Sequence, residues 1–550
     1  MIGKLSRRHQ SIFVLFSYTA LAFLFVGRLW IFHPFSQVVG VNGDSYIFIF
    51  MLKWWLHAII YQVNPLYVSR IWAPLGSNLM FTTNLPLFSV LMAPVTDFLG
   101  PAFSFNILIT LAPIASAFVM YLFVRWYLKD GLSAWVAGFI YGFSTFEMVH
   151  IYNGHLNLVW TFYLPAIVWL ICAKFSSLIK NKKFVALLVL LLLAQFLTSK
   201  ELFSILTLAL FIWAALYCLL NWESRHLVFR MLPWVVVAYL ITLFLLSPLL
   251  YYAAILPNLR AYHPPVFFST DFLNYIFPTS YTWLGGQFFL PISQNFISVN
   301  SEQTAYLGWP LLFIVYLAIR QKKTKAVLLL LLAMLVFILL SMGPILHISG
   351  WSIVFMPWAA ISLLPLFKLI LPSRYTWLVF FILALIVAHW LSVRQWRPRW
   401  QSYLFVVLVV LFLLPAPTST KGNWYEPYQV LPDKVGLAIP KDSRVLVLSF
   451  SARLLGVAAI WNVDHQRFFM TSGDLGPGAI STSNFVAIHT FYPIFLKQRP
   501  KGFDKYLRES QSEYVLVSPK DYNNYYDTYL KSYVAQKKLI DGLYVLRLRA

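Results

Sequence analysis

The chain has 550 residues, of which 60% are hydrophobic and 11% charged, with a formal net charge of +23. A mean hydropathy of +0.71 lies far above that of soluble globular proteins, so a soluble enzyme is excluded. The basic residues stand in short clusters between long apolar runs, which is typical of cytoplasmic loops in membrane proteins and not of a nucleic-acid surface. No nucleic acid is therefore expected as a partner.

Acidic residues divide the chain near residue 420. Residues 1–419 contain only 8 of the 19 acids, and residues 420–550 contain the other 11. This distribution predicts two domains, a transmembrane module over 1–419 and a water-exposed domain over 420–550.

Eleven apolar runs in the first part approach the length of about 20 residues that a helix needs to cross a bilayer. They predict a polytopic α-helical membrane protein with about 11 transmembrane helices. The runs cover 11–31, 103–124, 132–149, 157–174, 184–200, 202–221, 231–252, 304–320, 326–346, 374–393 and 401–416.

Basic residues at alternate loops predict the orientation of these helices. Eighteen of them fall on the side of the N-terminus, and seven fall on or near the opposite side. The positive-inside rule makes the N-terminus cytoplasmic, and an odd number of spans places the C-terminal domain outside. We expect a multi-pass protein of the cytoplasmic membrane.

Two further apolar stretches, 85–100 and 351–370, lie in predicted outer loops and contain internal prolines. We interpret them as interfacial or re-entrant segments and not as spans. If either crosses the membrane, the predicted topology changes.

The C-terminal part alternates strand-like and helical stretches. Residues 444–450, 514–518 and 543–548 read as strands and residues 490–508 as a helix, which predicts a small extracytoplasmic α/β domain. It contains no P-loop, nucleophile elbow or dinucleotide fingerprint, and its turn-rich stretch 472–478 is interpreted as a surface loop.

Asp44 is the leading candidate among six acids in or near predicted outer loops, because ionisable groups at the membrane are costly and often functional. It directly precedes a run of helical length, Ser45 to Gln62. Asp44 is either an N-cap of that helix or a carboxylate held at the mouth of a pocket.

Several local stretches, together with the pattern of spans, resemble a bacterial branch of the GT-C superfamily of integral-membrane glycosyltransferases. The shared order is a short first helix, an Asp in the first outer loop, a helix lying on the membrane, many spans and an outer soluble domain. The stretches are Gly43-Asp44 with Trp54-Trp55, Asn64-Pro65, Gly142-Phe-Ser144, Asn153-Gly-His-Leu-Asn-Leu158, Tyr306-Leu-Gly308 and Pro372-Ser-Arg374.

The resemblance implies a hexosyl- or pentosyltransferase that is embedded in membrane lipids. It would take a sugar from a polyprenyl-phosphate donor and transfer it to a glycan, lipid or protein acceptor outside the cytoplasmic membrane. It also implies that Asp44 is the catalytic carboxylate. A lone carboxylate opposite a departing phosphate suits an inverting displacement. The alternative is a transporter or flippase of lipid-linked saccharides, although no internal repeat is visible.

Positive charge is scarce on the predicted outer side, so Lys200, Arg260 and Arg374 are candidates for binding a leaving phosphate. Arg374 has the planar guanidinium that suits phosphate, or it anchors its helix at the interface. Lys200 and Glu201 are adjacent and form either part of the substrate site or a neutralising pair at a turn.

Glu147, His150 and His155 lie in the predicted outer loop between the third and fourth spans. We place Glu147 and His155 among the substrate-binding residues, with His155 as a hydrogen-bond donor to phosphate or sugar. The Asn153-Gly154 break argues against a metal site here, so no metal ligands are assigned, and a divalent metal such as Mg or Mn is left open. Asp271 and Glu302 frame a long aromatic loop that either stacks on sugars or belongs to an interfacial belt.

Overall fold

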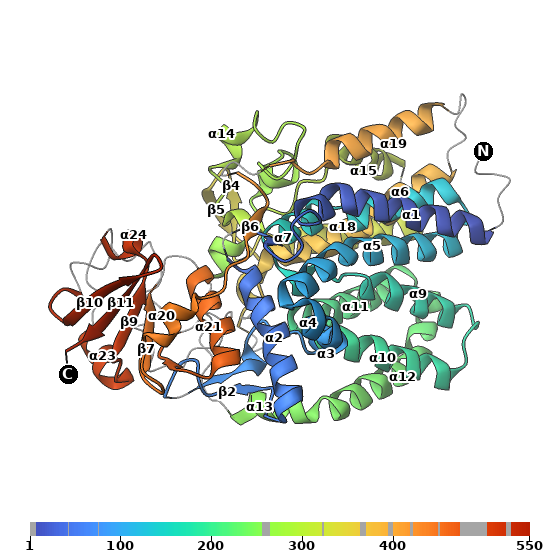
Figure 1. Ribbon diagram of the computed structural model, residues 1–550. Coiled ribbons are helices and arrows are strands. Elements are labelled where there is room, and N and C mark those ends of the chain that lie inside the picture. Colours follow the sequence, from blue (N-terminus) through green and yellow to red (C-terminus); the bar gives the residue numbers. More distant parts are fainter. Residues whose placement is uncertain are drawn as a thin grey trace. The chain divides into compact units, whose positions relative to one another are not determined.

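In the computed structural model the chain forms two compact units (Figure 1). The helical unit comprises Met1–Phe32, Asn106–Leu246 and His263–Tyr425, and the mixed unit comprises His33–Phe105, Ser247–Tyr262 and Glu426–Ala550. The described residues are 7–41, 43–74, 76–255, 264–321, 324–363, 370–393, 400–418, 422–448, 452–472, 503–523 and 530–549.

Each of the eleven predicted spans contains a helix. Among the described residues, eight helical segments are long and apolar enough to cross a membrane. They are Arg8–Leu29, Pro101–Leu128, Gly131–Tyr152, Leu156–Phe175, Asn181–Thr198, Lys200–Leu220, Trp222–Leu245 and Pro372–Val393. The other three predicted spans correspond to shorter apolar helices, α15 (Trp309–Gln321), α16 (Lys325–Ser341) and α19 (Trp400–Leu413). The chain is thus a multi-pass membrane protein.

Within the eight segments the principal helices are α1 (Arg7–Phe25), α5 (Pro101–Leu128), α6 (Gly131–Gly142), α7 (Thr145–Tyr152), α8 (Leu156–Val159), α9 (Tyr163–Phe175), α10 (Asn181–Thr198), α11 (Lys200–Leu220), α12 (Arg225–Leu245) and α18 (Thr376–Val393). Helix α18 is apolar on all sides and nearly every residue of it is buried, which makes it the core of the helical unit. It packs against α6, α15 and α16.

Small residues let α5 and α6 approach closely. A Cβ at Gly142 would lie 2.6 Å from the Ala117 backbone nitrogen, and one at Gly138 would lie 2.6 Å from the Ala117 carbonyl oxygen. Glycines four residues apart on one helix face are a common device for membrane helix packing, because the bilayer itself gives no hydrophobic drive to associate.

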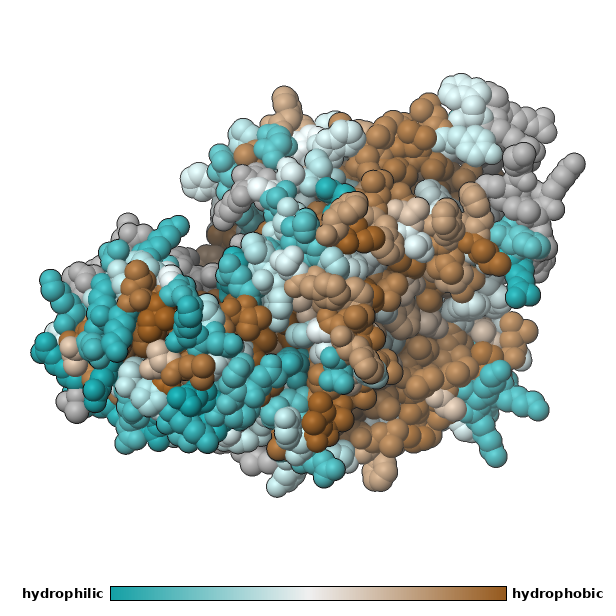
Figure 2. All heavy atoms as spheres, in the orientation of Figure 1, coloured by the Kyte–Doolittle hydropathy of each residue, from teal (hydrophilic) through white to brown (hydrophobic). Residues whose placement is uncertain are grey.

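The surface of the helical unit is apolar where its helices face outward. Figure 2 shows hydrophobic side chains gathered over these helices and hydrophilic side chains over the C-terminal sheet. Helix α12 is the most exposed of the long segments, with 11% of its apolar window buried. Such a face requires lipid as its solvent.

The two apolar stretches outside the predicted spans are not single long helices. Residues 85–100 form two short helices, α3 (Pro86–Leu91) and α4 (Ala93–Leu99). Residues 351–363 begin as strand β5 (Trp351–Phe355), which forms a hairpin with β4 (Ile345–Ile348), and continue into the short helix α17 (Trp358–Ile361). Neither element has the length of a span.

The mixed unit contains the C-terminal sheet, with strand order β10-β11-β9-β7-β8. Its strands are β7 (Arg444–Leu448), β8 (Phe469–Met470), β9 (Tyr514–Val517), β10 (Val534–Ile540) and β11 (Leu543–Leu548). Strand β7 runs parallel to β8 and β9, whereas β11 is antiparallel to β9 and β10. The three predicted strands are therefore confirmed. Of the predicted helix over 490–508, only α23 (Phe503–Ser510) is described, and most of the turn-rich stretch 472–478 lies outside the described residues.

The C-terminal part packs against the loop that follows the first helix. Helix α2 (Ser45–Tyr61) contacts α21 (Ala452–His465), and Lys53 pairs with Asp464 at 2.8 Å. The Tyr46 hydroxyl donates to the Pro427 carbonyl oxygen at 2.9 Å. The division into domains at residue 420 remains a prediction, and the mixed unit joins residues from both sides of it.

Candidate active site in the helical unit

Arg374 is the centre of a polar network at the start of α18. It lies in the turn Pro372–Tyr375, its side chain is 14% exposed, and it ion-pairs with Glu201 and Glu302. The Glu302 contact is 3.2 Å. Glu201 also accepts from the Leu371 backbone at 3.0 Å, and Glu302 accepts from the Ser373 hydroxyl at 2.6 Å. Glu201 thereby connects α11 to the turn before α18, and Glu302 connects the turn Asn300–Glu302 to the same place.

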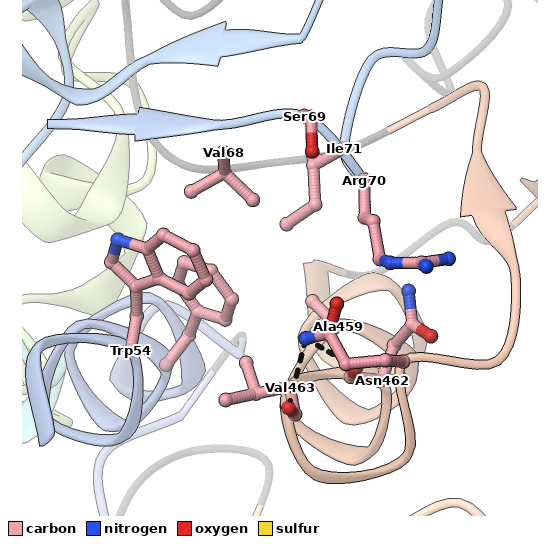
Figure 3. A pocket seen from close by; sticks show the side chains of 10 residues that line it. Trp54, Val68, Ser69, Arg70, Ile71, Ala459, Asn462 and Val463 are labelled. Atoms are coloured by element: carbon pink, nitrogen blue, oxygen red, sulfur yellow. Dashed lines mark hydrogen bonds between the residues drawn. The ribbon is translucent and has the colours of Figure 1, made fainter. Parts of the chain in front are cut away.

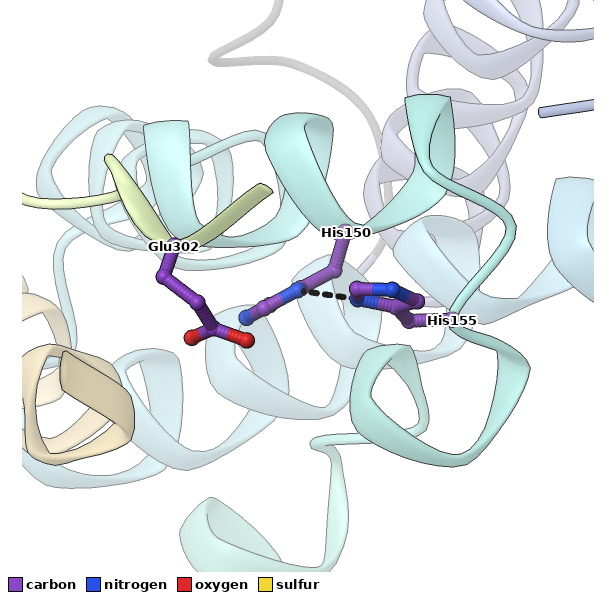
Figure 4. Close-up of side chains that lie close together, drawn as sticks. All are labelled: His150, His155 and Glu302. Carbon is purple, nitrogen blue, oxygen red and sulfur yellow. Dashed lines mark hydrogen bonds between the residues drawn. The ribbon is translucent and has the colours of Figure 1, made fainter. Parts of the chain in front are cut away.

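Two histidines lie next to this network. The Nδ1 atoms of His150 and His155 are 2.9 Å apart, a separation at which one neutral ring donates to the other. Figure 4 shows His150 between the carboxylate of Glu302 and the ring of His155. One ligand atom from each of the three residues lies within 4.8 Å of the others.

The helix break between α7 and α8 brings these histidines together. Helix α7 ends at Tyr152, Gly154 has φ +76°, and α8 begins at Leu156. A glycine adopts this left-handed conformation without the steric cost that a Cβ brings. The break that argued against a metal site in the sequence therefore folds His155 back toward His150.

Glu147, the third residue of the sequence cluster, does not join the histidines. It is buried, its backbone amide donates to the hydroxyl oxygen of the N-cap residue Ser144, and one carboxylate oxygen accepts from the Thr161 hydroxyl. Glu302 takes its place beside His150. Sequence distance concealed Glu302, because about 150 residues separate it from the histidines.

Lys200 and Glu201 begin α11, but the acid pairs with Arg374 across the helical unit. Arg260 lies outside the described residues. Among the aromatic residues of the long loop, Tyr275 and Tyr281 are buried and Trp283 is 60% exposed. Burial raises the pKa of Tyr281 to about 12, and its hydroxyl accepts from the Asn153 amide at 2.9 Å, so it stays protonated.

Asp271 stabilises a turn and lies in the long loop that it was expected to frame. Its buried carboxylate accepts from the backbone nitrogens of Leu273 (3.0 Å), Ser349 (3.1 Å) and Gly350 (2.8 Å). Three backbone donors satisfy a buried carboxylate and hold the turn of the β4-β5 hairpin.

Asp44 belongs to the mixed unit, at the N-terminus of α2. It occupies the N-cap position with φ −62° and ψ −27°, yet its side chain makes no capping hydrogen bond. The carboxylate is part-buried beside the buried Gly43 and Ser45. The N-cap alternative therefore loses its main physical support, since a capping Asp accepts from an amide of the first turn.

A small pocket in the mixed unit is large enough only for water, and two of its polar lining residues are paired within the protein. Its lining includes Trp54 from α2, Arg70, and Asn462 from α21 (Figure 3). Its volume of about 30 Å³ suits a water molecule. Arg70 pairs with Asp442 at 3.3 Å, and the Asn462 amide bonds to the Phe468 carbonyl oxygen at 2.7 Å.

Two solved structures share this architecture. The archaeal oligosaccharyltransferase AglB from Archaeoglobus fulgidus, in complex with an inhibitory peptide and a dolichol-phosphate, aligns with 99% of this chain and 74% of its own at 11% identity and a TM-score of 0.51. The arabinofuranosyltransferase AftD from Mycobacteria aligns with 94% of this chain and 37% of its own at 15% identity and a TM-score of 0.57. No protein-family model matches the chain, and no curated protein matches its sequence.

The chain is an integral-membrane protein with the GT-C fold. Its neighbours in structure are glycosyltransferases of that class, and their identities of 11% and 15% establish a common fold. The fold class expected from the sequence, a polytopic helical protein with a small C-terminal sheet, is thereby confirmed.

Proposed function

We propose that the protein is a membrane glycosyltransferase that transfers a hexose or pentose from a polyprenyl-phosphate donor to an extracytoplasmic glycan, lipid or protein acceptor, with inversion. The observation that carries this proposal is the GT-C fold combined with a part-buried carboxylate, Asp44, in the loop after the first helix. The dolichol-phosphate bound by AglB supports a donor of this chemical kind.

In the proposed reaction the Asp44 carboxylate takes the proton of the acceptor hydroxyl as the hydroxyl oxygen attacks the anomeric carbon. The bond from that carbon to the phosphate oxygen breaks on the opposite face, and the phosphate leaves with the electron pair. Such a displacement needs a general base on one side and positive charge or donors on the other.

The polar network around Arg374 is the proposed phosphate side, with Lys200, Glu201, Glu147, His155 and Arg260 as further substrate-binding residues. Arg374 faces two carboxylates, Glu201 and Glu302, and a protonated Lys200 would make this group of four residues neutral. A neutral network gives a departing phosphate little stabilisation. One more cation is therefore needed for this role.

His150, His155 and Glu302 have the donor atoms to hold that cation. Two imidazoles and one carboxylate suit zinc or manganese better than magnesium, which prefers oxygen ligands. Nitrogens that share a metal at about 2.1 Å lie about 3.0–3.4 Å apart, close to the observed 2.9 Å between the histidines, whereas the three ligand atoms lie within 4.8 Å of one another and would have to draw together around an ion. A bound divalent ion would supply electrostatic stabilisation to the leaving phosphate.

The proposal is tested with Asp44→Asn in purified, solubilised protein. The donor is first identified by mass spectrometry of co-purifying lipids, and turnover is then measured with synthetic polyprenyl-phosphate sugars. Loss of a general base lowers turnover by about 10²–10⁴-fold. The matched control is Asp97→Asn, an exposed acid on α4 of the same unit, which should retain activity. Undiminished turnover in Asp44→Asn would remove Asp44 as the base.

A transporter or flippase of lipid-linked saccharides is the competing hypothesis. Its deciding measurement is movement of a fluorescent polyprenyl-linked sugar across reconstituted vesicles in the absence of any acceptor. Movement without glycosyl transfer would favour the transporter.

A further inference from the structure

A second polar cavity lies in the helical unit at the other end of α10 from Arg374's network. It is lined by residues from the end of α9, the connecting loop, the start of α10 and the first half of α12, namely Lys174, Phe175, Ser177, Asn181, Leu227, Arg230, Met231 and Trp234. Its volume is about 120 Å³, well above the space that one water needs. Helix α10 has 18 residues and rises about 27 Å, which is close to the thickness of a bilayer core.

The cavity is built for an anion. Two of its lining residues, Lys174 and Arg230, are cationic, and none is acidic. Lys174 donates to the Ile179 carbonyl oxygen at 3.1 Å and to the Asn181 amide oxygen, which leaves one of its three protons for a ligand. The hydroxyl of Ser177 and the indole nitrogen of Trp234 add donors.

The helix that borders the cavity continues into an apolar face that faces outward. Val237, Ile241 and Leu245 on α12 are each at least 39% exposed. They follow Trp234 at intervals of three or four residues and so lie on the side of α12 that borders the cavity, where they could contact the apolar chains of a ligand with its charge in the cavity. A free anion would leave this face unused.

We propose that this cavity binds the headgroup of an anionic phospholipid, with its phosphate between Lys174 and Arg230 and its acyl chains along α12. The basic loops predict that this end of α10 is cytoplasmic, where anionic lipids attract basic residues. The site is separate from the proposed donor phosphate site, which lies at the opposite end of α10.

The test is a titration of the solubilised full chain with phosphatidylglycerol and with phosphatidylcholine, followed by native mass spectrometry. We expect phosphatidylglycerol to bind about tenfold more tightly, because each basic contact favours an anionic headgroup. The double variant Lys174→Gln/Arg230→Gln should lose this preference. Arg225→Gln is the matched control, since Arg225 stacks on Trp222 at 3.4 Å and does not line the cavity.

Replacing Lys174 could disturb the loop between α9 and α10, so Arg230→Gln is also tested alone. Arg230 is exposed, and its replacement should still weaken phosphatidylglycerol binding severalfold. Equal binding of the two lipids would overturn the proposal. So would an equal loss in Arg225→Gln, which would mean that binding follows bulk charge. Full displacement of phosphatidylglycerol by inorganic phosphate would identify a free anion as the ligand and would also overturn it.

Discussion

Arg374, Glu201 and Glu302 form a cluster of mixed charge in the helical unit. The sequence places Lys200 beside Glu201, which suggests a pair, but consecutive residues of a helix do not face each other. Glu201 reaches Arg374 instead, 173 residues further along the chain. The candidate residues could thus be selected from the sequence by scarcity of charge, whereas their partners depend on tertiary packing that no local pattern encodes.

A metal-binding role for His150, His155 and Glu302 predicts a measurable ion. Protein purified without chelator should contain about one equivalent of a divalent transition metal by elemental mass spectrometry, and His155→Ala or Glu302→Gln should lower its affinity at least about tenfold. Glu147→Gln is the control, because this buried acid lies outside the cluster. Full occupancy in Glu302→Gln would contradict the assignment.

The burial of His347 predicts that the free energy of unfolding decreases at acidic pH. It is buried in β4, and burial lowers its pKa although the Asp271 carboxylate opposes the shift. The folded protein keeps this ring neutral while the unfolded chain takes up a proton near pH 6.5, so the stabilisation is complete above pH 6.5 and falls as the pH drops.

The measurement is the thermal unfolding midpoint of solubilised protein between pH 7.5 and 5.5. His347→Gln should be less stable at pH 7.5 and should show a smaller acid-induced decrease than the original chain. An identical decrease in both would show that other groups control the acid response.

At the scale of elements, each of the eleven apolar runs predicted from the sequence contains a helix, because a bilayer crossing needs about 20 apolar residues in a helix. Composition could not distinguish full spans from α15, α16 and α19, whose boundaries depend on turns and packing. The β4-β5 hairpin was also missed as a strand pair, since its apolar residues give no alternating pattern.

Gly456 predicts a packing constraint between α2 and α21. A Cβ at this position would lie 2.5 Å from the Tyr46 Cβ, in the first turn of α2. Gly456→Val should lower stability by about 1–3 kcal/mol through overpacking, and Gly456→Ala by less. Thermal unfolding and turnover check this series, because α2 begins directly after Asp44. Unchanged midpoints in both variants would contradict the contact.

At the scale of the whole molecule, composition changes once, near residue 420, and predicts two consecutive domains. The compact units group residues 33–105 and 247–262 with residues 426–550, and the division into domains at residue 420 stays a prediction. Composition indicates whether a segment is surrounded by water or by lipid. It does not indicate which water-exposed segments pack together.

The predicted topology can be checked with single cysteines. After Cys172 and Cys218 are replaced by Ala, a membrane-impermeant maleimide should label Asn423→Cys in intact cells, and Lys180→Cys only after permeabilisation. Both positions are exposed, so both should react in solubilised protein. The reverse labelling pattern would mean that the orientation in the membrane is opposite to the predicted one. Labelling of both positions in intact cells would contradict the prediction that the two loops lie on opposite sides of the membrane.

The packing of α2 on α21 also affects biosynthesis. About 400 residues separate the two helices in the chain, and translation at about 5–20 residues per second needs roughly 20–80 s to supply them. During this interval α2 can pack on α3 and α4 but not on α21. Premature termination before α21 would remove that contact from the helix that follows Asp44, so we expect truncated chains to lose activity even with every transmembrane helix inserted.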